Sequence, residues 1–144
     1  MKVLHVISGL RGGGAEHFVF ELCRHSLKYG DVQMSVLSLA GANEIAQKFQ
    51  HYNIPLITVG QPDARRGVKA LKGFRALLHN KADVVHAHMF HACFVACMLK
   101  LFRPSTKVVF TLHNNYVPQL RRRLLLFFTR PLRNADIIFP RLSR

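Results

Sequence analysis

The chain begins Met1-Lys-Val-Leu-His-Val-Ile-Ser-Gly-Leu-Arg-Gly-Gly-Gly-Ala-Glu16, and this stretch predicts the fold. Its apolar start, from Val3 to Ile7, has the composition of a buried strand. Four glycines follow between positions 9 and 14, and a helical pattern begins at Ala15. Strand, glycine turn and helix form the opening unit of a doubly wound α/β sheet, which binds ligands at the carboxyl ends of its strands. The start of such a helix offers free N–H groups and a partial positive charge, so we expect a phosphate-compatible edge here.

The rest of the chain alternates between strand and helix periodicity. Such alternation implies parallel pairing with right-handed crossovers, so we expect a doubly wound, mostly parallel Rossmann-like sheet of about six strands. The expected strands are 2–7, 32–39, 55–59, 83–87, 107–112 and 135–139. The expected helices are 15–29, 43–51, 64–79, 90–102 and 118–134, the last of them kinked or ended near Pro131. The apolar stripes that define two of these helices are Phe18, Val19, Leu22 and Leu27 in the first, and Val68, Leu71, Phe74 and Leu78 in the third.

The composition fits one globular domain with anionic partners. With 144 residues, 49% of them hydrophobic, the chain is long and apolar enough to bury a core of its own. Its 21 Lys and Arg against 7 Asp and Glu give a net charge of +14. That charge favours nucleic acid, an anionic membrane or phosphorylated small molecules as partners, and composition alone leaves these open.

The cysteines and the apolar segments bear on the compartment. Cys23, Cys93 and Cys97 are odd in number and form no Cys-x-x-Cys motif, so we interpret them as reduced core residues of a cytosolic protein. The longest apolar stretches, 93–99 and 124–128, fall well short of the ~18 residues that a spanning helix needs. Any membrane contact is therefore expected from the surface.

The glycine turn fits neither common nucleotide motif. A Gly-x-Gly-x-x-Gly register would need glycine at Arg11 or at His17, and Ser38-Leu39-Ala40 stands where an acidic residue is expected. A Gly-Lys-Ser/Thr sequence is also missing, so dinucleotide binding and ATP hydrolysis are disfavoured. Two interpretations stay open: the turn approaches a ligand, or it only permits tight packing of strand and helix.

Histidines gather at predicted strand ends, namely His86, His88, His91 and His113. The 86–91 segment is superficially like an H-x-H-x-D-H metal site, but Phe90 takes the aspartate position and no carboxylate follows nearby. We therefore expect no metal. Histidine near neutral pH can instead donate to phosphate or sugar hydroxyls, or accept their protons. His86 can equally be a core residue of a buried strand, whereas His113 lies in a polar turn.

Basic residues are patterned along two segments. One side of the 64–79 helix and the region before the apolar 124–128 strip carry candidates for contact with a membrane or another anion: Arg65, Lys69, Lys72, Arg121, Arg122 and Arg123. Each Lys or Arg near an anionic lipid surface contributes roughly 1 kcal/mol. A solvated basic face is the open alternative. The phenylalanines look core-directed rather than interleaved with the charges, so we expect no nucleic acid.

Several segments, taken in order, resemble one family. Gly13-Gly-Ala-Glu16 at the opening of the first helix is similar to the start of bacterial family-4 (group 1) glycosyltransferases of the GT-B fold. Asp83-Val-Val-His-Ala-His88 is similar to the family's fourth strand and the turn behind it. Thr111-Leu-His-Asn114 is similar to its fifth-strand turn, and Ala135-Asp-Ile-Ile138 to the strand that closes its first domain. The resemblance spans nearly the whole chain.

The resemblance implies a retaining transferase that moves a sugar from a nucleotide-sugar to a lipid-linked or polysaccharide acceptor. Two Rossmann-like domains face each other in that family, and the first mainly holds the acceptor. By this resemblance Gly13 and Gly14 approach the donor diphosphate, His113 lies near the reacting sugar, and His86 and His88 line the acceptor side. The nucleotide-sugar is a co-substrate, and neither a further cofactor nor a metal is implied. Glu16 belongs to the helix start.

The family's second domain, with its Glu-x7-Glu signature, has no counterpart in these residues, and the ending at 139–144 departs from the family pattern. We therefore expect residues 1–144 to form a single acceptor-side domain without the nucleotide-sugar-binding domain. Such a chain is expected to be inactive alone, because catalysis needs groups fixed on both walls of the cleft. We expect it in the cytoplasm, peripheral to the inner face of the plasma membrane. The alternative is a non-catalytic module that binds a sugar-phosphate or an anionic membrane surface.

Overall fold

The fold is a single six-stranded sheet in a computed structural model that describes residues 1–41, 44–59, 66–113 and 135–138. The strand order is β3-β2-β1-β4-β5-β6, and every neighbouring pair is parallel. The strands are β1 (Lys2–Ile7), β2 (Gln33–Ser38), β3 (Leu56–Thr58), β4 (Val84–His88), β5 (Lys107–Thr111) and β6 (Ala135–Ile138). The helices are α1 (Gly14–Ser26), α2 (Glu44–His51), α3 (Arg66–His79) and α4 (Met89–Phe102). The predicted Rossmann-like sheet is confirmed, and the helix predicted over 118–134 lies outside the described residues.

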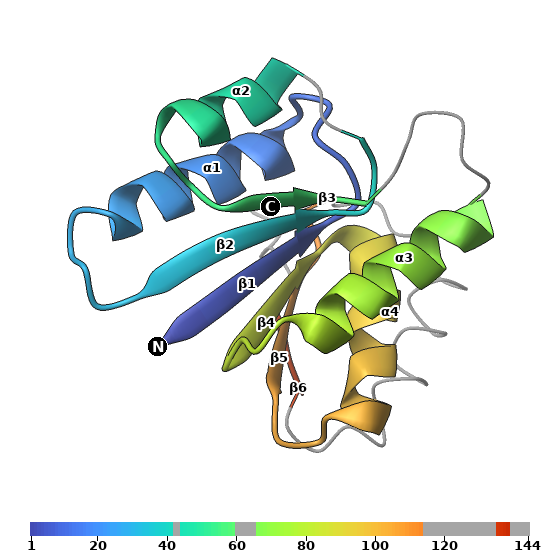
Figure 1. The fold of residues 1–144 in the computed structure, drawn as a ribbon. Coiled ribbons are helices and arrows are strands. Elements are labelled where there is room, and N and C mark those ends of the chain that lie inside the picture. Colours follow the sequence, from blue (N-terminus) through green and yellow to red (C-terminus); the bar gives the residue numbers. More distant parts are fainter. Residues whose placement is uncertain (42–43, 60–65, 114–134, 139–144) are drawn as a thin grey trace, which may run out of the picture.

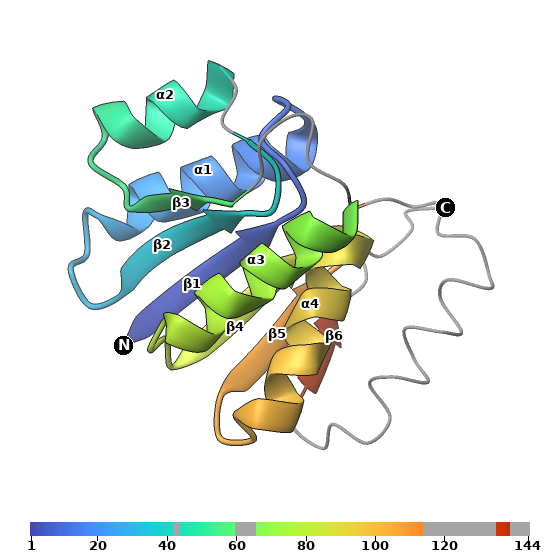
Figure 2. The same cartoon turned by 45° about the vertical axis from the view of Figure 1, so that its right-hand side comes forward.

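Helices cover both faces of the sheet. Figure 1 shows α1 and α2 on one face and α3 and α4 on the other. Figure 2 shows α3 and α4 side by side on the same face of the sheet, where α4 packs on β1, β4 and β5. The chain builds outward from β1 through β2 to β3, then returns to the other side of β1 as β4. This reversal places a crevice-forming switch point at the carboxyl ends of β1 and β4, where open α/β sheets bind ligands.

Side chains alternate between two cores because successive residues of a strand face opposite sides. Leu4 and Val6 of β1 join the core under α3 and α4. Ile7 joins the core under α1 and α2, together with Phe20 and Phe49 from those helices. By the same alternation, His5 faces the α1 side. His86 and His88 of β4 pair with His5 and Ile7, so the α1 side of the sheet carries three histidines among its apolar residues.

The buried stripe of α1 contains the predicted Val19 but differs from the prediction at Phe18 and Leu27. Phe20 and Cys23 are buried, whereas Phe18 is 48% exposed and Leu27 is also exposed. Phe20 meets the ring of Phe49 on α2 edge-on, at a centroid distance of 5.3 Å. Packing against α2 therefore decides which side of α1 is buried, and it leaves Phe18 near the strand ends.

The buried side of α3 agrees with the prediction at Phe74 and Leu78, which pack against the core, and differs from it at Leu71. Leu71 is 69% exposed, and Leu77 is fully buried. Gly73 faces the sheet, where a Cβ would meet the Leu39 side chain. The missing side chain lets α3 approach the end of β2 closely, with Leu77 buried in the core beside the predicted Phe74 and Leu78.

The three cysteines are free and buried, as predicted. Burial raises the pKa of Cys23 to about 12 and that of Cys97 to about 11, so these thiols stay protonated at neutral pH. Within the described ranges, none of the helices is long and apolar enough to cross a bilayer.

Candidate functional site

The carboxyl ends of three neighbouring strands meet at one edge of the sheet. Ile7 of β1 lies beside His88 of β4, and His88 lies beside Thr111 of β5. The glycine turn follows β1 at this edge, and its Gly12 has a φ of +82°, which favours glycine. Met89, directly after His88, has a φ of +69°, an unusual conformation for a residue with a side chain. Backbone strain of this kind concentrates at functional sites.

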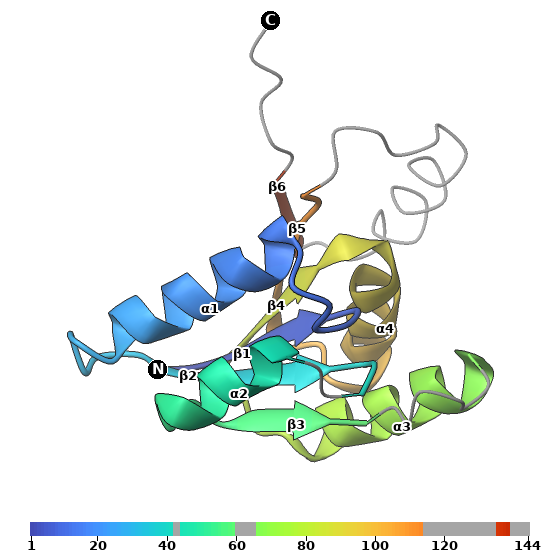
Figure 3. The ribbon, with the colours of Figure 1, turned by 90° about the horizontal axis from the view of Figure 1, so that it is seen from above.

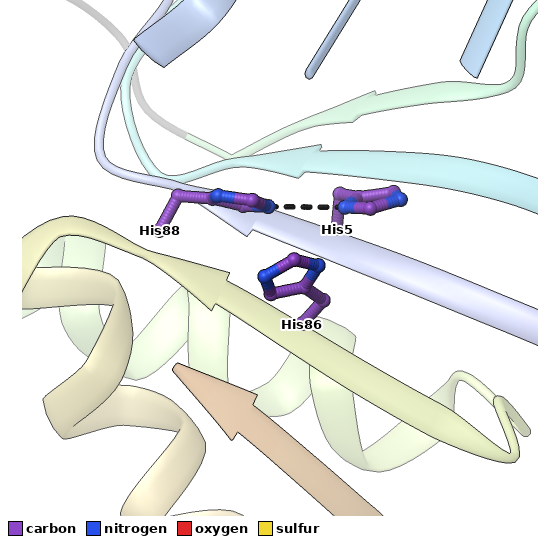
Figure 4. Close-up of side chains that lie close together, drawn as sticks. All are labelled: His5, His86 and His88. Carbon is purple, nitrogen blue, oxygen red and sulfur yellow. Dashed lines mark hydrogen bonds between the residues drawn. The ribbon is translucent and has the colours of Figure 1, made fainter. Parts of the chain in front are cut away.

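Three imidazole rings form a hydrogen-bonded line from the buried centre of the sheet to this edge. Nδ1 of His5 lies 3.0 Å from Nε2 of His88, and Nδ1 of His88 lies 2.9 Å from Nε2 of His113. Figure 4 shows the first of these hydrogen bonds, with His86 beside it. His5 is 1% exposed and His88 is fully buried, whereas His113 is only partly buried. We call His5, His88 and His113 the histidine row.

His86 lies against the row without belonging to it. Its ring centroid is 4.0 Å from that of His88, and its Nε2 is 2.8 Å from Oγ1 of Thr111. The strand register explains why His86 lies against His5 and His88. His86 pairs with His5 and is two residues from His88 on the same face of the sheet.

The rings of this site are held neutral. Burial, aided by the neighbouring His86, lowers the pKa of His5 to about 3. Burial, followed by the charge of His113, lowers the pKa of His86 to about 4. Burial lowers the pKa of His88 further still, and the other three rings add to the effect. Burial also lowers the pKa of His113, where the Glu16 carboxylate partly offsets it. At neutral pH each ring therefore carries one N–H and one lone pair.

The first turn of α1 closes over the row. The ring of Phe18 lies 5.4 Å from that of His113 and 6.3 Å from that of His88. Figure 3 shows the start of α1 close to the ends of β4 and β5. Glu16 is buried, and a Cβ on Gly13 would lie 2.8 Å from its Oε2. The glycine turn and the histidine row are thus brought together around Glu16 and Phe18.

The predicted site residues fall in several places. Gly13 caps α1 and Gly14 is its first residue, with open space where a Cβ of Gly14 would point. His113 lies at the edge, and His88 reaches it through a hydrogen bond. His91, grouped with these histidines from the sequence, is exposed on α4.

Sequence reasoning missed His5. Finding it requires knowing that β1 pairs with β4, because that parallel register puts His5 next to His86. Among the described side chains, Nε2 of His5 and Oγ of Ser8 are buried without a hydrogen-bond partner.

The predicted basic surface is described only in part. Lys72 is exposed on α3, where it lines a hollow of about 520 Å³ together with Arg75 and His79. Lys69 belongs to the same helix. Another hollow of about 460 Å³ lies at the amino ends of β1 and β2, and the row lines neither of them. The remaining predicted contacts, Arg65, Arg121, Arg122 and Arg123, lie outside the described residues.

Three rings are close enough to be tested as metal ligands. One nitrogen from each of His5, His86 and His88 lies within 4.8 Å of the others. Neutral imidazoles suit zinc or copper. However, the hydrogen bond between His5 and His88 already uses one nitrogen of each ring, and no carboxylate belongs to the group. The absence of a metal stays a prediction.

Comparison with solved structures supports the fold at low sequence identity. Anabaena HepE, in complex with UDP and glucose, is 14% identical with a TM-score of 0.71, and the match covers 96% of this chain and 44% of HepE. Acinetobacter baumannii MurG is 16% identical with a TM-score of 0.58, covering 99% of this chain and 46% of MurG. UDP-GlcNAc 2-epimerase from Methanocaldococcus jannaschii is 17% identical with a TM-score of 0.58, covering 98% and 40%. The chain thus spans less than half the length of each.

No curated protein sequence gives a significant match. The sequence model described as Glycosyltransferase Family 4 matches residues 12–140, which is most of the chain. This match begins within the glycine turn and ends just after β6, so it includes His86, His88 and His113 but begins after β1. The chain therefore belongs to glycosyltransferase family 4 and has the fold of the N-terminal part of a GT-B protein.

Proposed function

We propose that this chain is the acceptor-side domain of a retaining glycosyltransferase that moves a sugar from a nucleotide-sugar to a lipid-linked or polysaccharide acceptor. The observation that supports this most is the position of His113. The histidine row holds it at the carboxyl edge of β5, beside the first turn of α1. A ligand-binding edge of an α/β sheet is where substrate chemistry is expected.

The proposed roles follow from this edge. Gly13 and Gly14 let the donor diphosphate approach the α1 backbone, whose free N–H groups favour anions. His113 contacts the transferred sugar, and a neutral imidazole can donate or accept a hydrogen bond there. His86 and His88 support the acceptor side. We propose that the nucleotide-sugar is the only co-substrate and that transfer needs no metal.

A second domain is proposed to hold the nucleotide. HepE is described with UDP and glucose, and an epimerase of Neisseria meningitidis with UDP-GlcNAc, which makes UDP-sugars the first donors to try. The 144 residues would supply one wall of the cleft, and a further domain or a partner chain the other. Because transition-state stabilisation needs both walls, this chain alone should release no UDP above background.

The test compares the 144-residue chain with the same chain joined to the second domain that its gene or a neighbouring gene encodes. UDP release and sugar transfer are measured with UDP-glucose and UDP-GlcNAc. The joined enzyme should turn over, and His113→Ala should reduce its turnover by about 100-fold or more, in the range of a lost acid–base or hydrogen-bonding group. His51→Ala, at an exposed position on α2, is the matched control. Turnover by the isolated chain, or an active His113→Ala enzyme, would contradict the proposal.

A second proposal concerns location. We propose that the protein works in the cytoplasm, at the inner face of the plasma membrane, and that the basic side of α3 meets anionic headgroups. The observation in favour is the exposed cationic group formed by Lys72 and Arg75 beside His79. Such contacts are electrostatic and weaken with salt.

A further inference from the structure

The histidine row has only two consistent proton arrangements. His5 meets His88 through Nδ1 and Nε2, and His88 meets His113 through the same pair of atoms. Each neutral ring has a single N–H. If a ring carried its proton on Nδ1 and the next ring on Nε2, two N–H groups would face each other. With the opposite combination, two lone pairs would face each other. The three rings must therefore all carry the proton on Nδ1, or all on Nε2.

The buried end of the row favours one arrangement. Nε2 of His5 has no hydrogen-bond partner, and His5 is 1% exposed. With all protons on Nε2, this atom would be a buried N–H without an acceptor. With all protons on Nδ1, it would be a buried acceptor without a donor. Among buried backbone groups an orphaned N–H is rarer than an acceptor without a donor, and by analogy the arrangement with Nδ1–H is favoured.

We propose that His5 and His88 are positioning residues, which fix the tautomer of His113 so that it presents Nδ1–H to a ligand. Nδ1 takes part in none of the hydrogen bonds of His113 in the described part of the chain. A fixed N–H at that place recognises a hydrogen-bond acceptor, such as a sugar hydroxyl or a phosphate oxygen. The importance of this donor for transfer rests on the proposed function, whereas the tautomer itself does not.

His5 acts on the tautomer of His113 through His88, which lies between them. His5 lies in β1, His88 in β4 and His113 just after β5, so the row crosses three strands of the sheet. The Phe18 ring lies against the rings of His88 and His113. The Glu16 carboxylate partly offsets the lowering of the His113 pKa by burial. Packing alone can hold a ring in place, but only the hydrogen bonds along the row determine which nitrogen carries the proton.

The direct test is nitrogen NMR of the ¹⁵N-labelled 144-residue chain at pH 7, because the two neutral tautomers and the charged ring give different ¹⁵N shifts and ring couplings. His5, His88 and His113 should each show a single neutral tautomer, with the proton on Nδ1. A proton on Nε2 of His113, a mixture of tautomers in it, or different tautomers along the row would overturn the proposal. Stoichiometric binding of added Zn²⁺ that removes these N–H groups would also overturn it.

Variants separate this role from simple packing. His5→Phe keeps a ring in β1 but removes the end of the row, so His113 should lose its single tautomer although no recorded contact joins the two residues. His86→Phe changes a ring whose centroid lies 4.0 Å from that of His88 yet outside the row, so His113 should keep its tautomer. An unchanged His113 in folded His5→Phe would overturn the proposal. If His5→Phe does not fold, the tautomer of His113 is compared between His88→Phe, where it should no longer be single, and the unaltered chain, where it should be Nδ1–H.

These outcomes are independent of turnover. A fixed Nδ1–H on His113 together with full activity of the joined His113→Ala enzyme would reject the proposed function and leave the row intact. A mixed tautomer together with an inactive His113→Ala enzyme would do the reverse.

Discussion

Gly12 has a backbone conformation that favours a residue without a side chain. Its φ of +82° is unfavourable for L-residues, so Gly12→Ala should lower the free energy of unfolding by about 1–2 kcal/mol. Urea unfolding measures this loss. Gly14→Ala is the matched control two residues later, because its Cβ would point into open space at a helical position. A loss at Gly14 as large as that at Gly12 would contradict the explanation.

The neutral histidines make stability depend on pH. The pKa of His5 falls from 6.5 to about 3 on folding, and that of His88 falls further. Below pH 6.5 the unfolded chain therefore binds protons that the folded chain does not, so stability is full above about pH 7 and is lost as the pH falls towards 3. At about 1.4 kcal/mol per pH unit for each group, these two should remove about 4 kcal/mol between pH 7 and pH 5.

Urea unfolding at pH 7, 6 and 5 measures this slope. His5→Phe removes one of the titrating groups, so the free energy of unfolding of this variant should depend less steeply on pH. His51→Gln changes an exposed histidine on α2 and is the control that should leave the slope as it is. Stability that stays constant from pH 7 to pH 5 would mean that the rings are not held neutral.

The sequence indicates the edge residues better than it indicates their partners. Strand ends and the polar turn around His113 are visible from composition, and so is the pair His86 and His88 at alternate positions. His5 lies within an apolar run, and its place depends on which strand becomes the neighbour of β1. That neighbour is β4, 81 residues away between His5 and His86, and no local pattern reports it.

At the scale of the elements, the close approach of α3 to the sheet depends on Gly73. A Cβ there would overlap the Leu39 side chain and touch Val59 at 3.7 Å. Gly73→Ala should therefore lower the free energy of unfolding by about 1–3 kcal/mol, as overpacking does in other cores, despite the better helix propensity of alanine. Thermal or urea unfolding measures the change. Leu71→Ala on the exposed side of α3 should cost well under half as much, and equal losses would place the contact elsewhere.

Periodicity predicts where these elements begin and end, because it depends on local spacing. The strands agree with the sequence prediction to within one residue at each end. The buried sides of the helices are less predictable, since α1 and α3 each expose some residues of their predicted stripes. In α1 the competing residues Phe18 and Phe20 are both large and apolar, and the tertiary contact with Phe49 decides between them.

At the scale of the whole molecule, a net charge of +14 predicts binding to vesicles that contain phosphatidylserine, weakening as salt screens the charges. Lys72→Glu with Arg75→Glu should weaken this binding at least about tenfold, because each cation near the surface contributes about 1 kcal/mol. Lys28→Glu with Lys48→Glu makes the same change of charge in the turn after α1 and on α2, across the sheet, and should have the smaller effect. Vesicle sedimentation at low and high salt gives the result. Equal effects of the two pairs would assign the binding to net charge rather than to α3.

The architecture also has a consequence for how the protein is made. β1 is synthesised first, yet it ends in the middle of the sheet, between β2 and β4. From Ile7 to its partner His88 the ribosome must add 81 residues (88 − 7), which takes about 4–16 seconds at roughly 5–20 residues per second. Until then, the His5 ring has no His88 to bind. The residues of β1 and the glycine turn are translated first. The site is complete in a nascent chain only after β5 and the turn behind it have emerged.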